Sequence, residues 1–161
     1  GPIFTTHRFA LDNDITSDEL FAELGELGVG AVIETLEKIE RGEKPKKQSN
    51  DGATRALKLT RDEARIDWSL PAENVSAKIR AFTSSPGAWT TFRGQPVKIS
   101  QPVISREVLE PGAIQLINKN FYVGTSTTAL TIGFIASSGK ALTAASSWAN
   151  GARLSLGDHF E

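Results

Sequence analysis

The spacing of apolar residues differs between the two halves of the chain, and this difference limits the folds that it can adopt. Near the N-terminus, Leu20, Leu24 and Leu27 recur at helical spacing. From residue 88 onward, short runs of β-branched and aromatic residues alternate with turn residues instead. Helical and strand-like periods that occupy separate parts of a sequence favour an α+β fold over an alternating α/β fold. We therefore predict an α+β protein.

The N-terminal part carries the signals of one strand and one long helix. Residues 3–11 are rich in β-branched and aromatic side chains, which is typical of a β-strand. Thr16 and Glu19 form a capping-box pair at the start of a helix that Gly42 would end. The apolar stripe of helix 16–41 needs a partner surface to cover it. Without that surface, we expect self-association through this helix or a mobile N-terminus.

The second half has the signals of several short strands around few helices. Ser69 and Pro71 indicate a helix start, and Val75 and Ile79 would face the core. Strands are expected at 88–93, 95–105, 113–118, 121–125 and 128–136, then a helix at 141–150 and a short strand within 151–158. Two prolines place strand 95–105 at a sheet edge or bulge. Five or six short strands with one inserted helix fit a small closed barrel such as the OB-fold.

Composition indicates a globular chain without thiol chemistry. Hydrophobic residues make up 39% and charged residues 23%, which excludes a disordered chain. The absence of cysteine excludes disulfides and thiolate metal sites, and it fits a reducing compartment. No apolar run approaches the ~20 residues of a membrane span. We expect a cytoplasmic protein without a membrane partner.

Basic residues are concentrated in the middle of the chain. Residues 1–37 hold one basic and eight acidic residues, whereas residues 38–65 hold nine basic and five acidic ones. A local cationic surface suits a polyanion such as RNA, although a charge block is more often only a solvated face. Our candidate RNA contacts are Lys44, Lys46, Lys47, Arg55 and Lys58 in the linker, with Arg93, Lys98, Lys140 and Arg153 on the later strands and loops.

Few residues point to catalysis or to metal binding. His7 and His159 lie at opposite ends of the chain, and neither has a nucleophile or carboxylate at a recognisable spacing. The glycines at 25, 28 and 30 fall in the middle of the expected helix rather than after a strand, so a phosphate-binding loop is excluded there. Each of the three tryptophans is flanked by core-like residues and is expected to be buried. We assign no catalytic residue and no metal ligand.

Several segments follow an order that no general rule of folding requires. These are Ile66-Asp67-Trp68-Ser69, Ile79-Arg80-Ala81-Phe82, Pro86-Gly87-Ala88-Trp89, Trp148-Ala149-Asn150-Gly151 and Leu156-Gly157-Asp158-His159-Phe160. With them, nearly the whole chain resembles the C-terminal portion of the methionyl-tRNA formyltransferase family. Members of that family join a folate-binding, Rossmann-like catalytic domain to an OB-like barrel that contacts tRNA.

The resemblance implies a domain organisation and a set of partners. Residues 1–41 would be the remnant of the catalytic domain, 42–70 a basic linker, and 71–161 the OB-like tRNA-binding domain. Initiator Met-tRNA would be the partner, and 10-formyltetrahydrofolate would be the formyl donor of the intact enzyme, with no cofactor in this piece. The residues of formyl transfer would precede Gly1, so the piece alone is expected to be inactive.

Related formyltransferases share parts of this pattern, which leaves two alternatives. The chain could come from another 10-formyltetrahydrofolate-dependent formyltransferase whose acceptor is a sugar nucleotide. It could also be a non-catalytic interaction barrel. The basic linker favours RNA over a sugar nucleotide, because a polyanion gains more from several separate cations than a single nucleotide does.

Overall fold

The structure is a computed structural model that describes residues 1–161, and these residues form two compact units. Unit 1 is Gly1–Lys58 and unit 2 is Leu59–Glu161. Unit 1 contains one long helix, whereas unit 2 contains two short helices and all six strands. The predicted α+β class is confirmed. None of the helices has the length and apolar content needed to span a lipid bilayer.

The long helix of unit 1 begins and ends where the sequence predicts. Helix α1 covers Ser17–Glu40. The backbone N–H of Glu19 donates to the hydroxyl of Thr16, and the Glu19 carboxylate accepts the backbone N–H of Thr16, which completes the capping box. Gly42 follows the helix with φ +75° and donates its N–H to the Ile39 carbonyl. Only glycine adopts this conformation without strain, so Gly42 ends the helix as expected.

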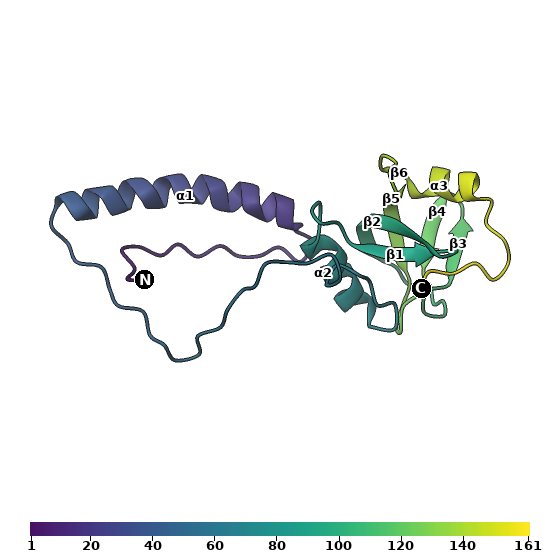
Figure 1. The fold of residues 1–161 in the computed structure, drawn as a ribbon, viewed down its shortest axis with the longest axis horizontal. Coiled ribbons are helices and arrows are strands. Elements are labelled where there is room, and N and C mark those ends of the chain that lie inside the picture. The colour runs from purple at the N-terminus through teal and green to yellow at the C-terminus, as the bar shows by residue number, and fades with distance from the viewer. The chain divides into compact units, whose positions relative to one another are not determined.

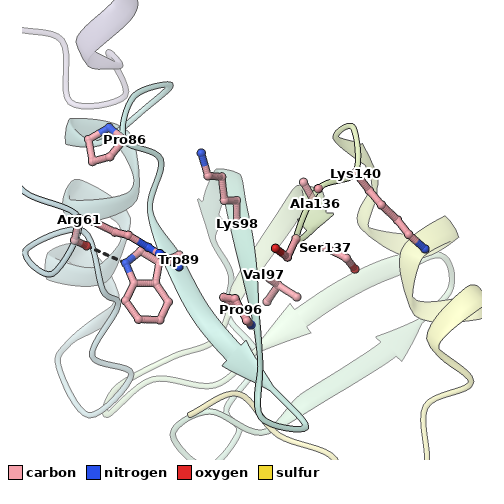
Figure 2. Close-up of a pocket in the computed structure, with 11 residues that line it drawn as sticks. Arg61, Pro86, Trp89, Pro96, Val97, Lys98, Ala136, Ser137 and Lys140 are labelled. Carbon is pink, nitrogen blue, oxygen red and sulfur yellow. Dashed lines mark hydrogen bonds between the residues drawn. The ribbon is translucent and has the colours of Figure 1, made fainter.

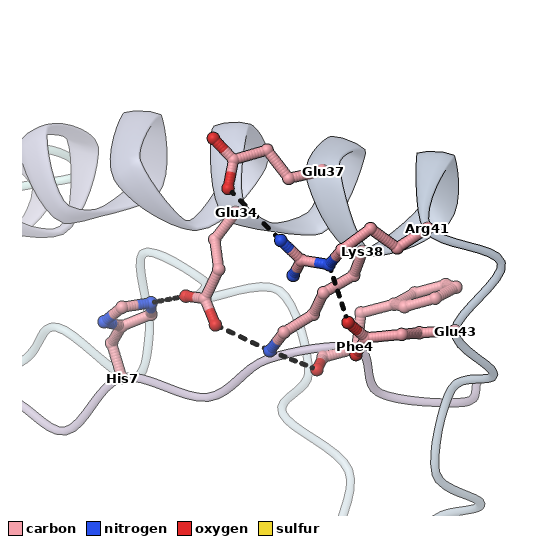
Figure 3. Close-up of polar contacts among 7 residues, drawn as sticks. All are labelled: Phe4, His7, Glu34, Glu37, Lys38, Arg41 and Glu43. Atoms are coloured by element: carbon pink, nitrogen blue, oxygen red, sulfur yellow. Dashed lines mark hydrogen bonds and ion pairs between the residues drawn. The ribbon is translucent and has the colours of Figure 1, made fainter.

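The predicted strand at 3–11 is wrong. The segment is extended, but its only ladder contact is a single bridge between Ile3 and Lys46. It lies along α1, where the Lys38 ammonium donates to the Phe4 carbonyl and to the Glu34 carboxylate (Figure 3). His7 contacts the same carboxylate at 3.0 Å. A β-prone composition cannot by itself make a strand, because a strand also needs a neighbouring strand with which to pair.

Unit 2 is built on one antiparallel sheet (Figure 1). Its strands are β1 Trp89–Phe92, β2 Gln95–Ile104, β3 Ile114–Ile117, β4 Asn120–Val123, β5 Leu130–Ser137 and β6 Thr143–Ala144. They follow the order β1-β2-β5-β4-β3, and β6 pairs with β5. The predicted hairpins around Gly94 and around Asn118 and Lys119 are confirmed, with positive φ at all three of these turn residues.

Residues 159–161 connect the two ends of this sheet. Phe160 pairs with Phe92 of β1, and His159 pairs with Ala113 just before β3. The Phe160 N–H donates to the Gly112 carbonyl, and Glu161 exchanges backbone hydrogen bonds with Thr91. The first and last strands of the order are thereby joined through one short segment. The predicted strand within 151–158 is wrong, since the pairing residues follow that range.

Strand β2 shows where prolines can enter a sheet. The sequence places this strand at an edge or a bulge, and the strand lies between β1 and β5. Pro96 pairs only with β1, because the pairing with β5 begins at Val97. Pro102 pairs only with β5, because the pairing with β1 ends at Lys98. Each proline therefore sits where β2 has a single neighbouring strand and where no second partner requires its missing N–H.

The core of unit 2 lies between the sheet and its helices. Helix α2, Ala72–Ala81, packs against β2, and helix α3, Ala145–Ala152, packs against β4 and β5. The predicted helix 141–150 therefore starts later, because residues 143 and 144 form β6. Ser69 does not cap α2; its N–H and hydroxyl both donate to Asp67. The core side chains include Val75, Ile79, Phe121, Leu130, Ile135 and Phe160.

Residues 59–70 pack with unit 2, although the sequence interpretation assigned them to the linker. Ala64, Ile66 and Trp68 are buried in the core. The indole N–H of Trp68 donates to the buried Thr90 hydroxyl at 3.0 Å, and that hydroxyl donates to the Glu161 carbonyl at 2.7 Å. The alternation of buried and exposed residues from 64 to 68 gives this segment one face toward the core.

Candidate nucleic-acid interface

A hollow of about 470 Å³ opens on unit 2 beside Trp89 (Figure 2). Residues from six parts of the unit line it: the segment before α2, the segment between α2 and β1, strands β1, β2 and β5, and the turn after β5. Three of the lining residues are cations and none is a carboxylate. The lining residues are Arg61, Pro86, Trp89, Pro96, Val97, Lys98, Ala136, Ser137, Ser138, Gly139 and Lys140.

Trp89 fixes the position of the first cation. Its indole N–H donates to the backbone carbonyl of Arg61 at 2.7 Å. The Arg61 guanidinium carbon lies 5.2 Å from the centre of the indole ring, and that of Arg65 lies 5.6 Å from it. Both distances are in the range of cation–π attraction. Backbone hydrogen bonds from Trp89 to Ala64 and from Ile66 to Trp89 hold the whole segment against β1.

Lys98 is positioned by a glycine. A Cβ atom on Gly87 would stand 2.9 Å from Cδ of Lys98 and 3.2 Å from its Cε and Nζ. Gly87 also has φ +87°, which a side chain would strain. The bare backbone at Gly87 therefore leaves room for the Lys98 stem, whose ammonium group extends away from the sheet (Figure 2).

A tight turn after β5 carries Lys140. The Lys140 N–H donates to the Ser137 carbonyl at 2.9 Å, and Gly139 has φ +72°. The Ser137 hydroxyl accepts the indole N–H of Trp148 at 3.0 Å. Because Trp148 packs against the core, this hydrogen bond ties the turn to the interior of the unit.

Arg93, another of the sequence candidates, has a structural partner. Its guanidinium forms an ion pair with Asp158, with 2.6 Å between Nη2 and Oδ2. It also donates to the backbone carbonyls of Ala152 and Arg153, and it lies over the Phe92 ring. The Arg93 guanidinium holds the pKa of the Asp158 carboxyl below its usual value, and Asp158 in turn raises the pKa of Arg93. Arg93 thus fastens the segment after α3 to the β1–β2 turn.

The nine cations named from the sequence are divided between the units. Five lie in unit 1: Lys44, Lys46, Lys47, Arg55 and Lys58. Four lie in unit 2: Arg93, Lys98, Lys140 and Arg153. All nine side chains are exposed. The structure brings Lys98 and Lys140 to the hollow together with Arg61, and it leaves Arg93 and Arg153 outside its lining.

Sequence reasoning missed Arg61 and Arg65. Their spacing of four residues, directly after Thr60, was a usable signal that both side chains lie on one side of a turn. Their common partner Trp89 follows 28 residues after Arg61, and no local pattern links the two. Of the three tryptophans expected to be buried, only Trp68 is fully so, while Trp89 and Trp148 are half-buried.

Acidic residues and histidines form no cluster of a size that could hold a metal ion.

A comparison with protein families assigns the chain to one family. Residues 58–153 match the family described as formyl transferase, C-terminal domain. The chain belongs to this family. The match includes every residue that lines the hollow and all of α2 and the six strands.

The curated relatives are methionyl-tRNA formyltransferases. The enzyme of Streptomyces avermitilis is 38% identical over 161 residues, which cover 98% of this chain and 52% of the relative. That of Mycobacterium sp. (strain KMS) is 40% identical over 157 residues, covering 96% of this chain and 51% of the relative. The chain thus spans about half the length of the curated relatives that it matches.

Solved structures share this formyl transferase fold. HypX from Aquifex aeolicus, in complex with tetrahydrofolic acid, matches 92% of the chain and 27% of its own length, with a TM-score of 0.75 and 22% identity. A sugar 3N-formyl transferase, WlaRD, matches 88% of the chain and 51% of its own length, with a TM-score of 0.54 and 18% identity. At these identities the likeness concerns the fold alone.

Proposed function

We propose that this chain is the tRNA-binding part of a methionyl-tRNA formyltransferase. It would hold initiator Met-tRNA so that the aminoacyl amine can be formylated. The observation that carries the proposal is the hollow beside Trp89, which has three cations and no carboxylate in its lining. The identity of 38% to the Streptomyces avermitilis methionyl-tRNA formyltransferase, over 98% of the chain, supports RNA as the polyanion.

The proposed contacts are mainly to phosphates. Cations on exposed side chains bind the RNA backbone, which gives affinity without sequence information. The candidates are Lys44, Lys46, Lys47, Arg55, Lys58, Arg93, Lys98, Lys140 and Arg153. To reach a phosphate, Arg93 would have to give up its ion pair with Asp158. We therefore expect the lysines to contribute more to tRNA affinity than Arg93 does.

The formyl donor of the whole enzyme is proposed to be 10-formyltetrahydrofolate, and we assign no residue of this chain to it. Formyl transfer requires a donor held beside the attacking amine, with acid–base groups in reach. We propose that the chain alone has no formyltransferase activity. Measurable folate-dependent formylation of Met-tRNA by the purified chain would contradict this. A role in translation initiation would place the protein in the cytoplasm.

Two other functions compete with this proposal. The fold likeness to the sugar 3N-formyl transferase keeps a sugar-nucleotide acceptor as the first alternative. A non-catalytic interaction barrel is the second. The three functions differ in what the chain binds, because only the first requires affinity for tRNA that falls with added salt.

The test is a titration of the chain with initiator tRNA, elongator tRNA and a dTDP-sugar at several salt concentrations. We expect weak, salt-sensitive binding of both tRNAs with little preference between them. Replacing both Lys46 and Lys47 with glutamine should weaken both complexes and flatten the salt slope by ~1–2 units. The matched control is Arg106→Gln with Lys119→Gln, which removes the same charge elsewhere. Binding of the dTDP-sugar without binding of tRNA would favour the first alternative.

A further inference from the structure

Trp89, Arg61 and Arg65 form a cluster that the sequence does not reveal. The indole N–H holds the Arg61 backbone, and both guanidinium groups lie near the indole ring. Backbone hydrogen bonds join Trp89 of β1 to Ala64 and Ile66, the two neighbours of Arg65, so the segment that carries the arginines is not held by side chains alone. A cation held in one place loses less conformational entropy on binding an anion than a mobile one does.

Acidic residues lie near both arginines: Asp62 and Glu63 stand between them in the sequence, and Asp67 and Glu161 line a second hollow together with Arg65. Glu63 lies between the two arginines in the sequence, but its carboxylate accepts the N–H and the hydroxyl of Thr60, both at 2.8 Å. Those hydrogen bonds lower the pKa of Glu63, so it stays ionised while being held by Thr60. Asp62 is exposed. The Arg93 guanidinium is committed to Asp158, whereas those of Arg61 and Arg65 contact the Trp89 ring.

From this arrangement we infer that Trp89 is a positioning residue, which holds Arg61 and Arg65 at β1 as a phosphate-binding surface of fixed geometry. Of the two arginines, Arg61 shares the lining of the hollow with Lys98. The inference rests on the proposed function and names the part of unit 2 that contacts the tRNA backbone. A guanidinium is planar and can donate two parallel N–H bonds to one phosphate, whereas an ammonium acts as a point charge. The surface would therefore bind phosphates through directed hydrogen bonds as well as through charge, whereas the lysines of unit 1 would act through charge.

The first experiment replaces both arginines and leaves Trp89 in place. In the full chain, Arg61→Gln with Arg65→Gln should weaken tRNA binding on the order of tenfold and lower the salt slope by ~1–2 units. The pair Arg106→Gln and Lys119→Gln loses the same charge from exposed positions outside the hollow, and it should change the affinity less. Thermal melting should be nearly the same in both doubles, because all four side chains are exposed.

A second pair of variants separates charge from geometry. Arg61→Lys with Arg65→Lys keeps both charges but removes the planar groups, so the salt slope should persist while affinity falls several-fold. Trp89→Phe removes the indole N–H and weakens the cation–π contact, and it should reproduce that loss of affinity. Trp89 also packs against the core, so Trp89→Phe could lower the melting temperature. In that case the tRNA affinities of the arginine variants decide the test.

The outcomes distinguish the two levels of the proposal. If the chain binds tRNA and the Arg61/Arg65 double behaves like its control, the inference is overturned and the proposed function stands. Full affinity in the double lysine variant would likewise overturn the positioning role, because charge alone would then suffice. If no form of the chain binds tRNA, both the proposed function and the inference that rests on it are wrong.

Discussion

The two units show what local signals can build and what they cannot. In unit 1, a complete capping box starts a helix of 24 residues in which no residue is buried. In unit 2, the N-cap residues of the ten- and eight-residue helices, Pro71 and Ala144, make no side-chain capping hydrogen bond, yet both helices bury residues against the sheet. Capping decides where a helix starts, while packing decides whether it is enclosed.

The largest expected effect comes from matched phenylalanines. Phe121 is 1% exposed in unit 2, whereas Phe21 is 75% exposed on α1. Phe121→Ala should lower the free energy of unfolding of unit 2 by about 3–5 kcal/mol, and Phe21→Ala should change it by less than about 0.5 kcal/mol. Urea denaturation followed by tryptophan fluorescence reports on unit 2, because all three tryptophans lie there. If the two substitutions changed the free energy of unfolding equally, the contrast between the units would be wrong.

The next effect concerns the exposed apolar residues of α1. We propose that this helix mediates self-association, because Leu24, Val32 and other apolar side chains on it are exposed. Leu24→Lys with Val32→Lys should weaken association at least tenfold, as measured by sedimentation at several concentrations. The control is Leu156→Lys, at an isolated exposed leucine of unit 2. A monodisperse monomer at every concentration would rule the proposal out.

A smaller effect is expected at the helix start. Thr16→Ala removes the hydroxyl that accepts the Glu19 N–H, and it should destabilise α1 by about 1 kcal/mol. Far-UV circular dichroism should show less helix, while the fluorescence transition of unit 2 stays where it was. Thr16→Ser keeps the hydroxyl and serves as the control. A shift of the unit 2 transition in Thr16→Ala would mean that the two units do not unfold independently.

The smallest effect is a pH dependence confined to unit 1. Hydrogen bonds from Lys38, Thr5 and His7 lower the pKa of Glu34 from 4.5 to about 2. Because the folded-state pKa is the lower one, the contact stabilises the segment along α1 above pH 4.5. This contribution is lost as the pH falls from 4.5 toward 2. Amide protection factors, which compare the measured exchange rate with the intrinsic rate at the same pH, should fall at residues 3–7 as the pH drops through that window, and Glu34→Gln should abolish the change. Protection factors that do not change with pH would contradict the role of Glu34.

Sequence reasoning succeeded where the deciding residues are close together in the chain. The Thr16–Glu19 capping box and the turns at Gly94 and at Asn118–Lys119 are each set within a few residues, and each is present. The strand at 3–11 failed for the opposite reason, because its existence depended on a partner strand that composition cannot supply. The prolines of β2 predicted the local environment but not the position of the strand between β1 and β5.

For the candidate site, too, the sequence predicts what depends on nearby residues and not what depends on distant ones. Any exposed lysine or arginine can be named from the sequence as a possible RNA contact, and Lys98 and Lys140 were named in this way. What groups them with Arg61 is the pairing of β2 with β5 and the hydrogen bond from Trp89. These are contacts between residues dozens of positions apart. The identity of a charged residue is local information, but membership of a surface is not.

The link made by residues 159–161 has a consequence for how the protein is made. Until those residues have been synthesised, β1 and the segment before β3 each present unpaired backbone groups along an open edge. Open edges can pair with other chains, so the nascent polypeptide stays prone to aggregation until this segment has emerged from the ribosome. The same segment brings Phe160 against Trp68 and the Glu161 carbonyl to Thr90, so sealing the edge and completing the interior are a single, late event.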